Sequence, residues 1–206
     1  MITIEKHTRD PKTGLLYHAW DESHQQPWAD PVTGCSPHFW SRAIGWYCMA
    51  IVDIIDHLPK NHKDRPEIIK ILDRTLSAIA QVQDEETGLW WQVLDKGNQH
   101  GNYLEASGSC MYVYAIAKGV RNGYLDKSFL SIAEKGFQGL IDHLITVDDD
   151  GQVNLHGICA SAGLGGNPYR DGSYDYYINE PIATNNLHGV GAFILAANEI
   201  EQLTTS

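Results

Sequence analysis

Two kinds of helix alternate along this chain of 206 residues. Apolar side chains recur on one helical stripe in residues 64–83 and 127–145, whereas residues 37–58, 105–117 and 189–197 are apolar on nearly every face. A striped helix needs cover on one side, and an all-apolar helix needs cover on most sides. The alternation therefore predicts α-hairpins, with the all-apolar helices inside a ring and the striped helices outside it.

Each striped helix is followed by a glycine turn, a short extended run and a long polar loop. The turn glycines Gly14, Gly88 and Gly151 lie 74 and 63 residues apart. Because every long loop joins an outer to an inner helix, we expect the loops to meet at one end of the ring and to form a site there. This layout predicts an all-α fold, an (α/α) toroid rather than a simple bundle.

A closed toroid of this kind has about six hairpins, and about three are visible here. Residues 1–9 are polar and have the character of the end of a helix. We therefore expect residues 1–206 to be a single domain that forms the C-terminal part of an (α/α)6 barrel.

Charge and hydropathy exclude several classes of partner. The formal net charge of −11 argues against nucleic acid, because phosphate binding needs a basic surface. No stretch approaches the roughly 20 apolar residues of a membrane span. Residues 1–6 are no signal peptide, so we expect no membrane association and a cytoplasmic location.

Cysteine and histidine spacing gives no metal-binding pattern. Cys35, Cys48, Cys110 and Cys159 lie far apart without a CxxC motif, and we interpret them as free buried thiols. The ten histidines form no HxxxH or HExxH pair. We expect neither a metal nor another cofactor.

The stretch SPHFWSRAIGW at 36–46 carries the strongest chemical signal. Ser36 and Pro37 predict a helix that starts at residue 37, because a serine hydroxyl caps free N–H groups and proline suits the first helical position. Burying Trp40, Arg42 and Trp46 requires partners. One interpretation is an aromatic core with a snorkelling arginine. The other is a pocket floor that stacks a sugar on tryptophan and binds a carboxylate through the arginine.

The chain is similar to the C-terminal half of the unsaturated rhamnogalacturonyl hydrolases, glycoside hydrolase family 105. The matching motifs, in order, are TGLLYHAWD at 13–21, SPHFWSRAIGW at 36–46, EASGSCM at 105–111, AGLGGNPYRDGSYDYY at 162–177 and GVGAFILA at 189–196. The resemblance implies an (α/α)6 barrel. It also implies hydration of the C4=C5 enol ether of a terminal unsaturated galacturonyl residue in pectin-derived oligosaccharides, rather than attack at the anomeric carbon.

By this resemblance, His18, Trp40, Arg42 and Trp46 bind the substrate, an unsaturated uronyl oligosaccharide. Arg42 would pair with the uronate carboxylate and the tryptophans would pack on the sugar rings. The resemblance places the acid/base aspartate in a WxD-type segment tens of residues before the first motif. Only 13 residues precede Gly14 and none form such a segment, so we expect the catalytic residue to lie outside this chain.

Other charged residues near the motifs have structural interpretations. We expect Asp21 and Asp30 to hold loops and Glu105 to cap the helix that follows it. Arg170 either lies over the pocket or pins its loop by pairing with Asp171 or Asp175, and we prefer the second interpretation.

The function remains open between an enzyme of the unsaturated-uronyl type and a truncated, inactive half-barrel that binds sugar without the acid/base aspartate. Another toroid, such as a sugar epimerase, would need histidine pairs that are absent here. Two helix flanks, residues 1–9 with 37–58 and residues 186–203, would be exposed in a partial ring. We expect them to be covered by a missing N-terminal half of the barrel or, in a homodimer, by a second copy.

Overall fold

The computed structural model describes residues 1–204, and most of its regular structure is helical. The α-helices are α1 (Ile2–Thr8), α2 (Ser41–His57), α3 (Arg65–Gln81), α4 (Ala106–Arg121), α5 (Leu130–Leu144), α6 (Tyr174–Asn179) and α7 (Leu187–Thr204). Two short 3-10 helices are η1 (Leu94–Lys96) and η2 (Lys127–Phe129). Strands β1 (Ile145–Val147) and β2 (Val153–Leu155) form one antiparallel pair, and β3 (Ile158–Cys159) and β4 (Ile182–Ala183) form another.

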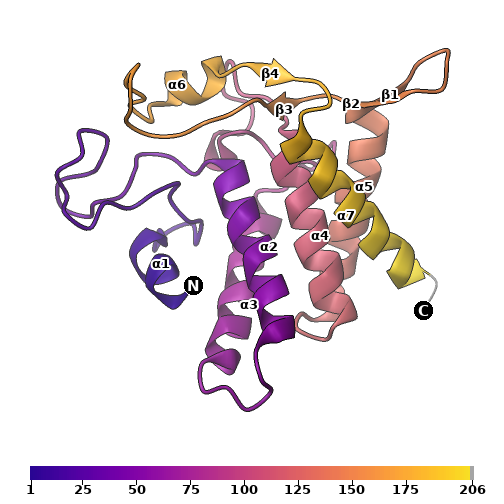
Figure 1. Cartoon of the computed structure of the whole chain (residues 1–206), viewed down its shortest axis with the longest axis horizontal. Helices are drawn as coiled ribbons and strands as arrows, with labels where there is room; N and C mark the ends of the chain where they lie inside the picture. The colour runs from indigo at the N-terminus through magenta and orange to yellow at the C-terminus, as the bar shows by residue number, and fades with distance from the viewer. Residues whose placement is uncertain (205–206) are drawn as a thin grey trace.

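The helices form two layers, as predicted. The inner helices α2, α4 and α7 lie side by side, and α4 contacts both of its inner neighbours (Figure 1). The outer helix α3 packs on α2, α5 packs on α4, and the short α1 packs on α3. The long segments that precede α2, α4 and α7 gather at one end, at the top of Figure 1. The predicted clustering of the loops is therefore confirmed.

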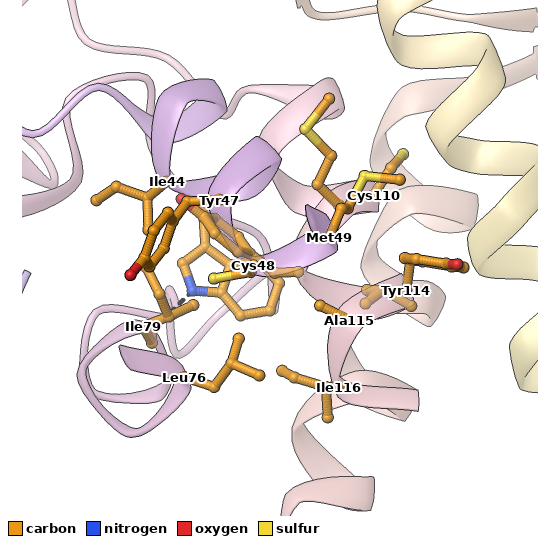
Figure 2. Packing of buried hydrophobic residues seen from close by; sticks show 14 of the residues in the cluster. Ile44, Tyr47, Cys48, Met49, Leu76, Ile79, Cys110, Tyr114, Ala115 and Ile116 are labelled. Atoms are coloured by element: carbon orange, nitrogen blue, oxygen red, sulfur yellow. Dashed lines mark hydrogen bonds between the residues drawn. The ribbon is translucent and has the colours of Figure 1, made fainter. Parts of the chain in front are cut away.

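The hydrophobic core lies between the two layers. Figure 2 shows Cys48 of α2 with Leu76 and Ile79 of α3 on one side and Ala115 and Ile116 of α4 on the other. All five side chains are buried. The four cysteines are free and buried, which confirms that interpretation. No helix within residues 1–204 has both the length and the apolar content to cross a bilayer.

The same type of turn occurs three times in the segments that lead from outer to inner helices. Asp10 accepts hydrogen bonds from the backbone N–H and the hydroxyl of Thr13, both at 2.8 Å, and Gly14 follows with φ +74°. The same contacts recur in residues 84–89 and again in residues 30–35. The turns at Gly14 and Gly88 were predicted from these glycines. The turn at residues 30–35, inside the loop before α2, was not predicted.

The start of α2 differs from the prediction. The helix begins at Ser41 rather than at residue 37. The Ser36 hydroxyl does not cap it, because its oxygen accepts the backbone N–H of Ala19 at 3.1 Å. Residues before Ser41 are extended instead, and Trp40 forms a backbone bridge with Val93. Backbone pairing with distant segments outweighs the local helix-start signal.

Helix α7 also differs from the prediction of an inner helix covered on most faces. Ala192, Ala196 and Glu199 are buried, but Leu187 is 84% exposed, Ile194 61% and Leu195 42%. The helix is apolar around its circumference, yet the described residues cover only one side of it.

Candidate active site

An aromatic cluster lies at the loop end of the inner helices. The indole of Trp40 stacks on Tyr177, with ring centroids 6.4 Å apart and planes inclined by 26°. The imidazole of His18 lies 4.7 Å from the Trp40 ring, and its Nδ1 is 2.6 Å from the Tyr177 hydroxyl oxygen. We call His18, Trp40 and Tyr177 the aromatic cluster. Its members come from the run after the first turn, from the start of α2 and from α6.

A buried glutamine connects two members of this cluster. The indole Nε1 of Trp40 donates to Oε1 of Gln92 at 3.1 Å. The amide Nε2 of Gln92 donates to the backbone oxygen of Tyr177 at 3.2 Å. Neither Gln92 nor Tyr177 was predicted as a site residue from the sequence. A signal was available for Gln92, because an amide in the apolar run Leu89–Leu94 needs a buried partner.

Glu105 caps α4, as predicted, and also binds the backbone of β3. Its carboxylate accepts the backbone N–H groups of Ser107 at 3.2 Å and Gly108 at 2.6 Å. It also accepts the backbone N–H of Cys159 in β3 at 3.0 Å. A carboxylate at this position suits the positive end of the helix dipole. Glu105 is fully buried, so one side chain fixes both the start of α4 and the strand beside it.

Arg42 lies on this carboxylate. Its Nε donates to the Ser107 hydroxyl at 2.7 Å, and its Nη2 donates to the backbone oxygen of Cys159 and lies 3.5 Å from Oε1 of Glu105. Only 2% of the Arg42 surface is exposed. We call Arg42, Glu105 and Ser107 the buried polar network. A substrate carboxylate would have to compete with Glu105 for this guanidinium, so a substrate-binding role of Arg42 stays a prediction.

The buried polar network supports the aromatic cluster from below. The guanidinium carbon of Arg42 lies 5.4 Å from the centroid of the Trp40 ring, within the range of a cation–π contact. Trp40 thus contacts both Arg42 and Tyr177. The residue is 6% exposed.

His18 is uncharged at neutral pH. Burial, and then the positive charge of Arg170, lower the pKa of its imidazole to about 4. Burial also raises the pKa of Tyr177, so its hydroxyl stays protonated. A neutral imidazole beside a phenol offers hydrogen bonds to a sugar hydroxyl without adding charge.

Trp46 lies at the edge of this arrangement. It is 47% exposed and lines a cavity of about 450 Å³ between α1 and α2, together with His18, Ile4, Ala43 and Ala50 among others. We call this cavity the α1–α2 groove. The structure thus brings His18 and Trp40 together, and His18 also shares the groove with Trp46. Arg42 lies beneath Trp40.

Arg170 pins its loop, as preferred above, but not through the predicted carboxylates. Its Nε donates to the backbone oxygen of Gly165 at 2.9 Å. Within residues 1–204, no ion pair joins it to Asp171 or Asp175. Its positive charge also contributes to the lowered pKa of His18, so a place over the pocket stays a prediction.

Asp21 and Asp30 hold the loop before α2. Asp21 accepts the backbone N–H groups of Gln25 at 2.7 Å and Gln26 at 2.9 Å, and these bonds, that of Gln26 first, lower its pKa to about 2. Asp30 anchors the copy of the repeated turn at residues 30–35. Among the described residues, no group of three histidine, cysteine or acidic side chains is placed to hold a metal ion.

The sequence profile of Glycosyl Hydrolase Family 88 matches residues 1–204. The chain belongs to this family. A solved glycoside hydrolase of family 105 from C. acetobutylicum superposes with a TM-score of 0.96 and is 55% identical, over 98% of this chain and 56% of its own. This likeness confirms the resemblance to family 105 and the all-α fold, which corresponds to about three hairpins of an (α/α)6 barrel.

Two curated relatives agree with this membership of the family. The 24.9 kDa protein in the picA locus of Rhizobium radiobacter is 39% identical over 194 residues, 90% of this chain and 82% of that protein. The unsaturated rhamnogalacturonyl hydrolase YesR of Bacillus subtilis is 30% identical over 146 residues, 71% of this chain and 37% of that enzyme. The chain therefore spans about half of the matched solved structure and a little over a third of the Bacillus hydrolase.

Proposed function

We propose that this chain carries the sugar-binding wall of an unsaturated uronyl hydrolase of the rhamnogalacturonyl type, acting in the cytoplasm. The supporting observation is the aromatic cluster at the loop end of the inner helices. A sugar presents C–H groups to an aromatic face and hydroxyls to polar groups; His18 of this cluster and Trp46 beside it are the members of the cavity lining that offer both kinds of surface. The similarity to the unsaturated rhamnogalacturonyl hydrolase of Bacillus subtilis supports a pectin-derived oligosaccharide as substrate.

In this proposal each predicted residue has a distinct task. Trp40 touches the unsaturated ring with the small part of its side chain that stays exposed, and His18 hydrogen-bonds to a ring hydroxyl as a neutral imidazole. Trp46, at the half-exposed edge, packs on the next sugar. Arg42 holds Trp40 in place from below. The carboxylate of the substrate is then left for a second cation, and Arg170 over the pocket fits that task.

The reaction needs an acid/base group as well as this wall. Water adds across the C4=C5 bond, one carbon taking the proton and the other the hydroxyl, and the hydrated product releases the next sugar. The nearby carboxylates of Asp21, Asp30 and Glu105 already accept backbone N–H groups. We therefore propose that the aspartate that transfers the proton comes from outside these residues.

Binding and turnover can be measured separately. We expect the chain to bind an unsaturated galacturonyl–rhamnose disaccharide in calorimetry, and we expect Trp40→Ala to weaken that binding at least tenfold. The saturated disaccharide is the control. Equal affinity for both sugars, or no measurable binding of either, would contradict the proposal.

A sugar-binding half-barrel without catalysis is the second candidate. It is favoured because the carboxylates of Asp21, Asp30 and Glu105 already accept backbone N–H groups. Ultraviolet absorbance of the enol ether separates the two: its loss with the chain alone would show that one of these carboxylates does transfer the proton.

A further inference from the structure

The hydroxyl of Tyr177 has one hydrogen-bond partner among residues 1–204, which is Nδ1 of His18 at 2.6 Å. Tyr177 is fully buried, so no group outside these residues can reach that hydroxyl. A buried phenol proton without an acceptor would cost about 1–3 kcal/mol. The proton therefore points at Nδ1, which accepts it through its lone pair.

The acidity of the two groups favours the same direction of this hydrogen bond. A neutral imidazole has one N–H group and one nitrogen with a free lone pair. That nitrogen is a stronger base than the phenol oxygen, so an O–H···N bond is favoured over an N–H···O bond. Burial and the charge of Arg170 keep the imidazole of His18 neutral at pH 7, because they lower its pKa to about 4.

Gln92 holds Tyr177 in place for this contact. An indole N–H can only donate a hydrogen bond, and a backbone carbonyl can only accept one. Oε1 of Gln92 accordingly faces Nε1 of Trp40, and Nε2 of Gln92 faces the backbone oxygen of Tyr177. These partners admit only one orientation of the amide. Because Gln92 is fully buried, the two bonds fix Tyr177 of α6 against Trp40.

We infer that Tyr177 is a positioning residue that fixes the tautomer of His18, with the imidazole proton on Nε2. When one ring nitrogen accepts a hydrogen bond, the proton of a neutral imidazole stays on the other nitrogen. His18 lines the α1–α2 groove, and its Nε2 has no hydrogen-bond partner in the part of the chain that the structure describes. The group that His18 offers to a ligand is therefore an uncharged N–H donor.

This tautomer restricts what His18 does toward a sugar, a step that rests on the proposed function. An Nε2–H group binds an acceptor oxygen, such as the ring oxygen of the enol ether, a carboxylate oxygen or the lone pair of a hydroxyl. It cannot take a proton from water or from the sugar, because Nε2 already carries one and Nδ1 is occupied by Tyr177. His18 thus recognises an acceptor oxygen of the unsaturated uronyl sugar and is not the general base.

Nitrogen NMR of the full chain with isotope-labelled histidines tests the tautomer without any sugar. A protonated ring nitrogen and a lone-pair nitrogen have well-separated chemical shifts, and His18→Gln identifies the His18 signals by their loss. At pH 7 we expect a protonated Nε2 and an unprotonated Nδ1 at His18. A protonated Nδ1, a charged ring or an even mixture of the two tautomers would overturn the inference.

The variant Tyr177→Phe tests whether this tyrosine sets the tautomer. It removes the hydroxyl and keeps the ring that stacks on Trp40. The Nδ1 signal of His18 should therefore move toward that of a nitrogen without a hydrogen bond, and the Nδ1–H tautomer should gain population. Tyr176→Phe is the matched control, because the Tyr176 hydroxyl accepts the N–H of Gly163 instead. An unchanged Nδ1 signal in Tyr177→Phe, or an equal change in the control, would refute the role of Tyr177.

Addition of the unsaturated galacturonyl–rhamnose disaccharide separates this inference from the proposed function. We expect the sugar to shift the Nε2–H signal of His18 and to leave its tautomer unchanged. Binding with transfer of the proton to Nδ1 would overturn the donor role. No binding would contradict the proposed function and with it the role of His18 toward a sugar, whereas the spectrum without sugar decides the tautomer independently.

Discussion

The buried polar network and the aromatic cluster lie against each other, yet their polar groups are treated differently. Arg42 and Glu105 are at most 2% exposed, and their charges meet each other and the backbone of β3. His18 is only partly buried, has a lowered pKa and faces an open groove. In the buried polar network, each buried charge has a partner of opposite charge. In the aromatic cluster, the imidazole of His18 is neutral and still borders the open groove, which suits a group that binds a ligand.

The strongest test of the buried network is Glu105→Ala. The variant removes the α4 cap and leaves the Arg42 guanidinium without its ion-pair partner, so the free energy of unfolding should fall by about 3–5 kcal/mol. Urea unfolding measures this loss. Asp126→Ala is the control, because Asp126 caps the short η2 at the surface and its removal should cost far less. A loss below 1 kcal/mol at Glu105 would mean that the network is not a stability element.

Arg42→Met separates the two roles suggested for this arginine. If Arg42 serves the network, the variant leaves Glu105 buried without its ion-pair partner and costs about 3 kcal/mol or somewhat more. The double variant Arg42→Met/Glu105→Gln should then lose less than the sum of the single variants. Thermal and urea unfolding measure these changes. A stable Arg42→Met chain that has lost sugar binding would instead support the carboxylate-binding role.

His18 makes stability depend on pH. Its pKa lies near 4 in the folded chain and near 6.5 when unfolded, so between these values the unfolded chain binds more protons. The contribution is therefore complete above pH 6.5 and is lost as the pH falls toward 4, up to about 3 kcal/mol. Unfolding free energies at pH 7 and pH 4.5 measure it. His18→Gln should show a shallower fall, and an identical fall in both proteins would refute the assignment.

Tyr177→Phe should have a smaller effect. It removes the hydroxyl that lies 2.6 Å from Nδ1 of His18 and leaves the ring stacked on Trp40. Loss of one buried hydrogen bond costs about 1–2 kcal/mol. Urea unfolding and sugar affinity are the readouts. Tyr176→Phe on the same helix is the matched control, because its hydroxyl accepts the N–H of Gly163 in the outer loop instead.

Sequence reasoning succeeded where the cause is local and missed what depends on distant partners. Glu105 was assigned as a cap because the helix it caps follows directly. The partners of Arg42 could not be predicted, because Ser107 and Cys159 lie 65 and 117 residues away in the chain. The Ser36 helix start was wrong for the same reason. Backbone bonds to residues 92–94 hold that segment extended, and no local pattern encodes them.

Helix α7 shows a different limit. Its apolar composition correctly marked it as an inner helix. Hydropathy states which faces avoid water and does not identify what covers them. The two layers of helices and the clustering of loops at one end were therefore predictable from the repeat. The exposed side of α7 could be identified only from the structure, because it depends on which elements pack against the helix.

Trp46→Ala should have the smallest effect on stability and gives the sharpest contrast with the core. Almost half of this indole is exposed to the α1–α2 groove, so its loss should cost the isolated chain at most about 1 kcal/mol. Trp90→Ala is the matched control. Trp90 is fully buried and donates Nε1–H to the backbone oxygen of Ile79 at 2.8 Å, and its removal should cost about 3–5 kcal/mol. Urea unfolding measures both. Equal losses would mean that Trp46 belongs to the core; a large difference would leave it free to bind a sugar ring.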